Sequence, residues 1–214
     1  ALITILFHTL CYSQNPIVTV DRPNIVGPTP TGNTPEISSS GFERGSGVVL
    51  ASGGSNFTAS QWNASTQADA ATNNEYIQWS ISASADNSIE ITEFDTRNKR
   101  NSNGPTDWQI FYSLDNFATA GIALIPAQTS TVTTANLNFN SLSIVSGTAG
   151  TITFRLYAWN STTNGGWFRI AGRTALSGFG IARPGLRMNG IITTTAANDT
   201  ESNIVSTGFD PTNN

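Results

Sequence analysis

The sequence predicts an all-β fold: a two-sheet antiparallel β-sandwich, jelly-roll-like, with about nine strands. Three observations support this class. Only 11% of the 214 residues are charged. Thr, Ile, Val and aromatic residues form short runs separated by Gly and Asn, which is typical of strands and turns. No long amphipathic helical pattern occurs. The length suffices for one domain with a sizeable core.

The chain opens with an apolar stretch, residues 1–14, that contains the single His8 and the single Cys11. This stretch predicts a signal-peptide remnant, since it is too short to span a membrane as a helix. A buried first strand of the domain is the alternative. Residues 15–40 carry five prolines. They are therefore expected to be a Pro-rich linker or an extended segment along a sheet edge, in which Ile17-Val18-Thr19-Val20 could form one short strand.

The β-sandwich domain is expected over residues 41–192, followed by a polar tail or linker over residues 193–214. The clearest strand covers residues 75–84, where Ile77, Trp79 and Ile81 share one face. Residues 97–104 predict a cationic loop ending in a Gly-Pro turn, followed by a strand from Trp108. Trp62, Trp79 and Trp108 are expected in the core. The other expected strands cover residues 48–50, 57–62, 89–94, 120–125, 131–139, 151–159, 167–170 and 186–192.

Several segments stand in a recognisable order. They are Phe42-Glu43-Arg44-Gly45-Ser46-Gly47, Gly104-Pro105-Thr106-Asp107-Trp108, Ser113-Leu114-Asp115-Asn116-Phe117 and Phe154-Arg155-Leu156-Tyr157. Together they resemble a β-sandwich module of secreted bacterial surface and sorting-signal proteins, including those of the Bacteroidota type IX secretion route. The resemblance covers residues 42–192. It implies a secreted or cell-surface location, a place within a larger protein and contact with secretion machinery in transit. It implies no established activity.

One departure from that family concerns metal. Relatives often continue Phe-Arg-Leu with Asp-Asn before the last strand, whereas here Ala171-Gly172 follows Phe168-Arg169-Ile170. A structural calcium ion held by that Asp in relatives would lack this ligand here. The remaining candidate oxygen ligands are Glu43, Asp199, Glu201 and Asp210, which have no clustered acidic spacing. No cofactor is therefore expected, and the metal content stays open.

Charge and composition exclude several functions. The net charge of -4 argues against nucleic acid as a main partner. No transmembrane segment is expected. A mature chain without His or Cys cannot hold a Ser-His-Asp triad, a Cys-His pair or a usual zinc site, so no catalytic residue is assigned. Glu90, Glu93 and Asp95 leave a carboxylate-based glycan hydrolase open, although ion pairs with Arg97 or Lys99 are the plainer reading.

Sugar binding is the stronger hypothesis. If the aliphatic residues of 151–159 and 167–170 face the core, the outward side chains are Arg155, Tyr157, Trp159, Trp167 and Arg169. Antiparallel pairing of these two strands would bring Trp159 near Trp167 and Tyr157 near Arg169. Flat aromatic rings flanked by guanidinium groups suit stacking on pyranose rings. The alternative is that residues 15–40 cover this face.

The sequence therefore predicts a non-catalytic exported module for carbohydrate binding or cell-surface adhesion. Its expected partner is an extracellular glycan or neighbouring copies of itself. A structural surface or fibre subunit, or a spacer domain, is the first alternative. A glycan hydrolase is the second.

Overall fold

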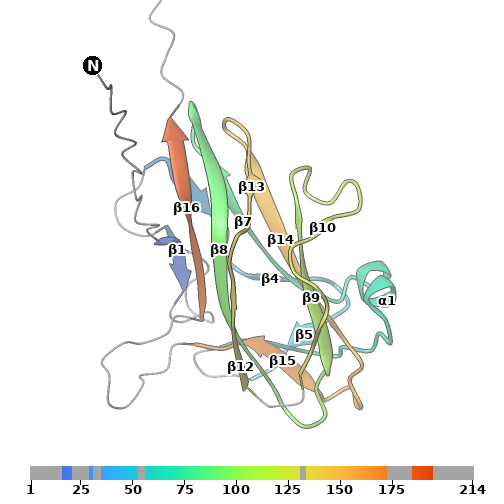
Figure 1. Ribbon diagram of the computed structural model, residues 1–214. Coiled ribbons are helices and arrows are strands. Elements are labelled where there is room, and N and C mark those ends of the chain that lie inside the picture. Colours follow the sequence, from blue (N-terminus) through green and yellow to red (C-terminus); the bar gives the residue numbers. More distant parts are fainter. Residues whose placement is uncertain are drawn as a thin grey trace, which may run out of the picture.

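A computed structural model describes residues 16–20, 29–30, 35–52, 56–130, 134–172 and 185–194. The described residues form sixteen strands and one helix. The strands make two sheets in which all neighbours are antiparallel, and the sheets pack face to face (Figure 1). The all-β two-sheet antiparallel sandwich predicted from the sequence is confirmed.

Within the described residues, the first sheet has nine strands and the second has seven. The first contains β2 (Thr29–Pro30), β1 (Pro16–Val20), β16 (Leu186–Thr194), β8 (Asn87–Arg100), β15 (Trp167–Ile170), β6 (Phe57–Ser60) and β5 (Val49–Leu50), with β12 (Thr134–Phe139) and β13 (Ile144–Val145) also paired to β8. The second contains β10 (Ile122–Ala123), β9 (Asp107–Ser113), β14 (Thr151–Trp159), β7 (Tyr76–Ala83) and β3 (Ile37–Ser39), with β11 (Gln128–Thr129) on β9 and β4 (Glu43–Arg44) on β7.

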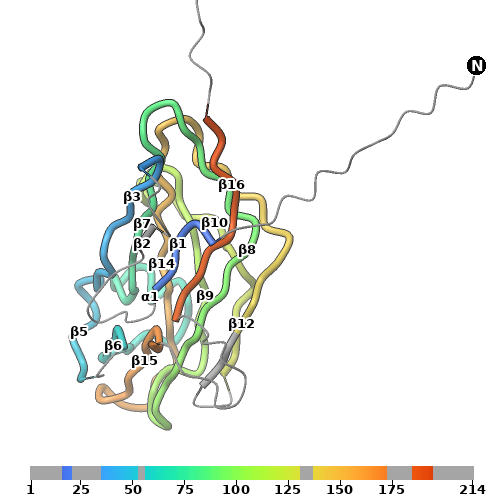
Figure 2. The backbone as a smooth tube through the Cα atoms, turned by 90° about the vertical axis from the view of Figure 1, so that its left-hand side faces the viewer, coloured from blue at the N-terminus to red at the C-terminus, as the bar shows by residue number. Residues whose placement is uncertain are grey.

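The long strand β8 organises the first sheet. The Arg97 backbone N–H donates to Gly185 O, and the Arg97 carbonyl accepts from Ala171 N–H. The backbone N–H and C=O of one residue point to the same side of a strand. Strands β15 and β16, which follow on from these two partners, therefore lie end to end along one side of β8. The first and last described strands, β1 and β16, run side by side (Figure 2).

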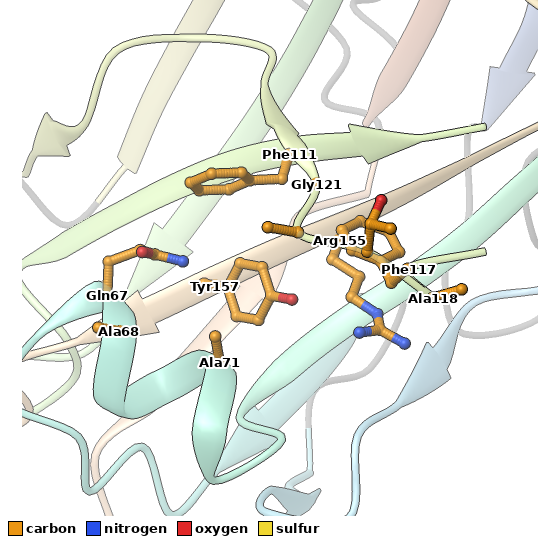
Figure 3. A pocket seen from close by; sticks show the side chains of 11 residues that line it. Gln67, Ala68, Ala71, Phe111, Phe117, Ala118, Gly121, Arg155 and Tyr157 are labelled. Atoms are coloured by element: carbon orange, nitrogen blue, oxygen red, sulfur yellow. The ribbon is translucent and has the colours of Figure 1, made fainter. Parts of the chain in front are cut away.

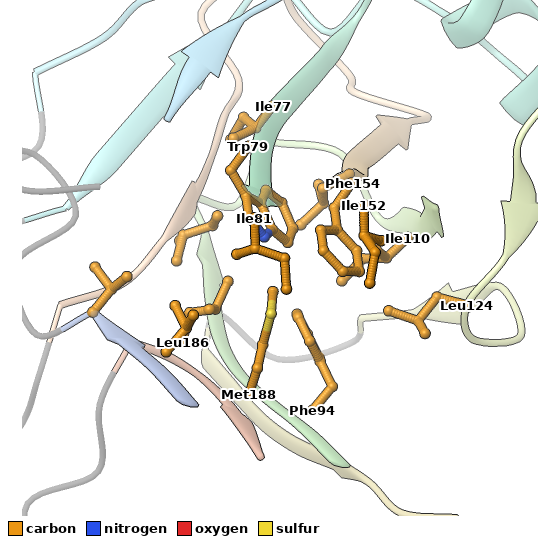
Figure 4. Close-up of a cluster of buried hydrophobic side chains, with 14 of the residues drawn as sticks. Ile77, Trp79, Ile81, Phe94, Ile110, Leu124, Ile152, Phe154, Leu186 and Met188 are labelled. Carbon is orange, nitrogen blue, oxygen red and sulfur yellow. The ribbon is translucent and has the colours of Figure 1, made fainter. Parts of the chain in front are cut away.

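The core lies between the sheets and follows the alternation of each strand (Figure 4). Ile77, Trp79 and Ile81 of β7 point inward and are at most 1% exposed. The Trp79 ring stacks on Phe154 of the same sheet at 5.4 Å and on Phe94 of the other sheet at 6.2 Å. This stack joins the two sheets through aromatic contact as well as apolar burial. Trp62 and Trp108 are also buried, as predicted.

Of the two alternatives for the Pro-rich segment, its described parts follow the extended one. The expected short strand Ile17-Val18-Thr19-Val20 lies within β1, β1 and β3 pair within the sheets, and Ile17, Val18 and Val20 are buried in the core. The domain therefore begins before residue 41. The expected cationic loop is instead the last part of β8, which continues to Arg100 and pairs with β12 and β15. The polar residues Arg97 and Lys99 tolerate a strand there because they lie on its outer face, opposite the buried Thr96 and Asn98.

The remaining boundaries agree closely. Strands β14 and β15 have the bounds expected from the sequence, and β16 ends at Thr194, two residues past the expected end. The expected signal-peptide remnant at residues 1–14 and most of the expected tail lie outside the described residues.

Candidate functional site

A short helix covers part of the outer face of the second sheet. Helix α1 (Gln67–Thr72) begins after the N-cap Thr66, whose hydroxyl accepts from the Asp69 backbone N–H. Thr at this position satisfies one of the free N–H groups of a helix start. The buried Ala70 packs with Tyr157 and Trp159 of β14 in a cluster separate from the main core. Figure 1 shows α1 on the side of β9 and β14 that faces away from β8 and β16.

Beside this helix the outer face stays open and forms a groove of about 530 Å³. Its floor is formed by Phe111 of β9 and by Arg155 and Tyr157 of β14 (Figure 3). One wall is α1, through Gln67, Ala68 and Ala71, and the other is the loop after β9, residues 117–121. The groove thus has aromatic rings along its floor and wall and polar groups at both sides, as small-molecule sites generally do.

Arg155 is the charged residue that lines the groove. Its guanidinium carbon lies 4.2 Å from the ring centroid of Tyr76 and 4.2 Å from that of Phe117. Its Nε–H donates to Gln78 Oε1 over 2.7 Å. Two cation–π contacts and one hydrogen bond fix the plane of the guanidinium group.

Tyr157 is packed between two rings. It meets Tyr76 at 5.8 Å and Phe111 at 5.6 Å, both edge to face. Burial raises the pKa of the Tyr157 phenol, although Arg155 acts in the opposite direction. The phenol therefore stays protonated at neutral pH, and its hydroxyl, which points toward Arg155 in Figure 3, remains a hydrogen-bond donor.

The wall that carries Phe117 is held by Asp115. The carboxylate of Asp115 accepts hydrogen bonds from the hydroxyls of Ser113 and Thr119, both over 2.6 Å, and from the Thr119 backbone N–H. The Ser113 hydroxyl also accepts from Phe117 N–H. Asn116 and Phe117 take positive φ angles of 56° and 61°. Asp115 and Asn116 therefore act as turn residues in this loop.

Acid is expected to loosen this loop. Hydrogen bonds from Ser113 and Thr119 hold the pKa of Asp115 below its ordinary value, which is about 3.9 in an unfolded chain. The pKa of Asp115 is lower in the folded protein than in the unfolded chain. The ionised carboxylate therefore stabilises the loop fully above the unfolded pKa, and this stabilisation is lost as the pH falls through the folded pKa. NMR titration should therefore show Phe117 signals moving together with the Asp115 carboxyl below about pH 4, and in Asp115→Asn that transition should be missing. Phe117 signals that move at the same low pH in both proteins would contradict this role.

The structure places the five predicted site residues in two separate regions. The expected pairing of residues 151–159 with 167–170 is wrong, because β14 pairs with β7 and β9 whereas β15 pairs with β6 and β8 of the other sheet. The loop after β14 therefore crosses between sheets instead of closing a hairpin. The inward and outward directions were predicted correctly, since Ile152, Phe154 and Leu156 lie in the core.

Arg155 and Tyr157 are brought together in the groove, but the other three predicted residues are not. Trp159 is buried beneath α1, at 8% exposure. Trp167 and Arg169 lie on the first sheet, where the guanidinium carbon of Arg169 is 3.8 Å from the Trp167 ring centroid. Among the described residues, α1 covers the outer face near Trp159, and the described parts of the Pro-rich segment, β1 and β3, pair within the sheets instead.

The carboxylates of β8 already have partners. Glu93 accepts from the amides of Asn138 and Asn189. Asp95 accepts from Asn138 and forms an ion pair with Arg187. The partner is thus Arg187 on the neighbouring strand, not the Arg97 or Lys99 expected from the sequence. Glu90 accepts from the Ser143 hydroxyl.

In the part of the chain that the structure describes, no group of three or more His, Cys, Asp or Glu side chains is placed to hold a metal ion. Glu43 is exposed on β4, and the other three calcium candidates of the sequence, Asp199, Glu201 and Asp210, lie outside the described residues. Among the described elements, no helix has the length and apolar character needed to cross a bilayer.

Comparison with known proteins gives no further assignment. No family model matches the chain, and no curated protein matches it significantly.

Sequence reasoning missed the residues that complete the groove. Strand alternation from Trp108 places Phe111 on the face opposite the buried Trp108 and Ile110, and nothing in the sequence marks Phe117 or Gln67 as ligand contacts. The alternation in residues 107–113 shows that Phe111 faces outward. Its position next to Arg155 follows only from the pairing of β9 with β14, which the sequence does not show. The position of α1 depends on long-range packing and leaves no comparable local signal.

Proposed function

We propose that this chain is a non-catalytic, exported carbohydrate-binding module, working in adhesion at the cell surface as part of a larger secreted bacterial protein. The observation that carries the proposal is the groove on the second sheet. Phe111 and Phe117, both partly exposed, provide apolar ring surface, Tyr157 lies in the floor at 4% exposure, and Gln67, Thr119 and Arg155 provide polar groups within the same space. Saccharides present apolar C–H faces and polar edges, so a groove with both kinds of surface suits them.

The arrangement supports binding rather than hydrolysis. Among the described residues, no carboxylate lines the groove, whereas glycosidases generally place two across the scissile bond. The carboxylates that the sequence offered for this role, Glu90, Glu93 and Asp95, lie on β8 of the other sheet and accept hydrogen bonds from neighbouring side chains.

A structural role between neighbouring copies is the second candidate. Exposed apolar side chains on two edge strands favour it: Leu50 of β5 is 74% exposed and Ile122 of β10 is 57% exposed. Both strands have only two residues, so each would add few backbone hydrogen bonds to a neighbour. We therefore rank this role below glycan binding.

A glycan array with matched variants tests the proposal. Phe117→Ala removes an aromatic wall of the groove and should weaken retention about 10-fold or more, since stacking on an aromatic ring is worth roughly 1–3 kcal/mol. Leu114→Ala is the control, because Leu114 belongs to the same loop, is 53% exposed and does not line the groove. Equal retention of wild type and Phe117→Ala, or retention of no glycan, would remove the proposal.

A further inference from the structure

Among the described residues, no carboxylate pairs with the charge of Arg155. Each of the other residues lining the groove is uncharged, and within the described residues Arg155 forms no ion pair. Asp95, by contrast, has Arg187. A half-buried cation that has lost part of its hydration and has no anion nearby is stabilised by any anion that enters the groove.

The guanidinium group is also set in position before a ligand arrives. The rings of Tyr76 and Phe117 contact the guanidinium, and Gln78 accepts from its Nε–H. The guanidinium also interacts with the Tyr157 oxygen, so the Nη N–H groups not directed at Tyr157 are the donors that remain for the oxygens of a ligand carboxylate. The hydroxyl of Tyr157 points toward this guanidinium and could donate to the same ligand (Figure 3).

We propose that the groove selects acidic saccharides, with the guanidinium of Arg155 pairing with the carboxylate of a uronic acid unit. This inference rests on the proposed carbohydrate-binding function and specifies its ligand class. The rings of Phe111 and Phe117 in the same groove distinguish a sugar from a simple carboxylate ion, because they offer apolar surface to the pyranose that carries the charge. A peptide C-terminus shares the carboxylate but not the pyranose faces.

The test uses titration calorimetry of the full chain with three probes. Oligogalacturonate is the acidic probe, its methyl ester is the neutral probe of the same sugar, and a short peptide with a free C-terminus is the carboxylate probe. Wild type should bind oligogalacturonate about 10- to 100-fold more tightly than the ester, the range expected for a charge-assisted hydrogen bond. That preference should shrink with added salt.

Two charge variants give the matched comparison. Arg155→Gln should lose the preference for the acid over the ester, whereas Lys99→Gln removes the same charge from the first sheet and should keep it. Circular dichroism serves to check that both variants are folded. Should Arg155→Gln prove unfolded, Arg155→Lys replaces it: this variant keeps the charge but not the planar fork, and it should bind the acid more weakly.

The outcomes separate the two proposals. Equal affinity of wild type for acid and ester, or glycans retained on the array with no uronate among those bound, would overturn the acidic preference and leave carbohydrate binding standing. Binding of the peptide in preference to oligogalacturonate would also overturn it. Retention of no glycan at all would remove the proposed function itself.

Discussion

Replacing Trp79 with alanine is expected to lower the free energy of unfolding by about 3–5 kcal/mol, the range for a buried Trp or Phe truncated to Ala. Trp79 is 1% exposed and stacks on Phe154 at 5.4 Å with an interplanar angle of 12°. It also contacts Phe94 of β8 and Phe42. Its removal leaves a cavity between the sheets. Urea denaturation monitored by circular dichroism measures the loss.

A comparison of two Phe substitutions checks the reason for this effect. The Trp79 Nε1–H is buried without a partner, so Trp79→Phe loses ring volume but no hydrogen bond. The Trp62 Nε1–H donates to Ala59 O over 2.8 Å, so Trp62→Phe also leaves a buried carbonyl short of a partner. We expect the second change to cost about 1 kcal/mol more than the first, from the typical value of one hydrogen bond. A larger loss of stability for Trp79→Phe than for Trp62→Phe would contradict this explanation.

Gly45→Ala is expected to destabilise the domain by about 1–3 kcal/mol, as forced overpacking does. A Cβ atom at Gly45 would lie 2.1 Å from the backbone oxygen of Asn74, and one at Gly47 would lie 2.1 Å from that of Asn73. The Gly45 N–H donates to Tyr76 O. An added Cβ therefore displaces the start of β7, which carries the Tyr76 ring beneath Arg155.

The neighbouring Gly41 supplies the control for this prediction. A Cβ atom there meets nothing within 4 Å, so Gly41→Ala should stay within about 0.5 kcal/mol of wild type. Thermal denaturation of the three alanine variants, at residues 41, 45 and 47, gives the comparison. A loss for Gly41→Ala as large as that for Gly45→Ala would show that close backbone approach is not what selects glycine in this segment.

The strands could be predicted because their signal is local. In β7 and β14, alternation of apolar and polar residues fixes which side chains face the core, and both strands lie where the sequence indicated. The end of β8 could not be predicted, since Arg97, Lys99 and Arg100 read as a loop by composition. They form a strand because neighbours on both sides supply backbone hydrogen bonds.

The site was only half predictable for a related reason. The alternation of side chains along β14 correctly predicts that Arg155 and Tyr157 face outward. It does not predict which strand pairs with β14. Adjacency in sequence suggested β15 as the partner of β14, whereas the chain crosses to the other sheet after Asn160 and β9 takes that place. Phe111 thereby lies opposite Arg155 in the pairing of β9 with β14, and α1 buries Trp159.

The most direct test of the central claim is an NMR titration that follows aromatic side-chain signals while the best-retained oligosaccharide of the array is added. The account predicts shifts at Phe111, Phe117 and Tyr157, which line the groove on the second sheet. Trp167 on the first sheet should stay unchanged. Shifts confined to Trp167 and its surroundings, with the three groove rings unaffected, would contradict it.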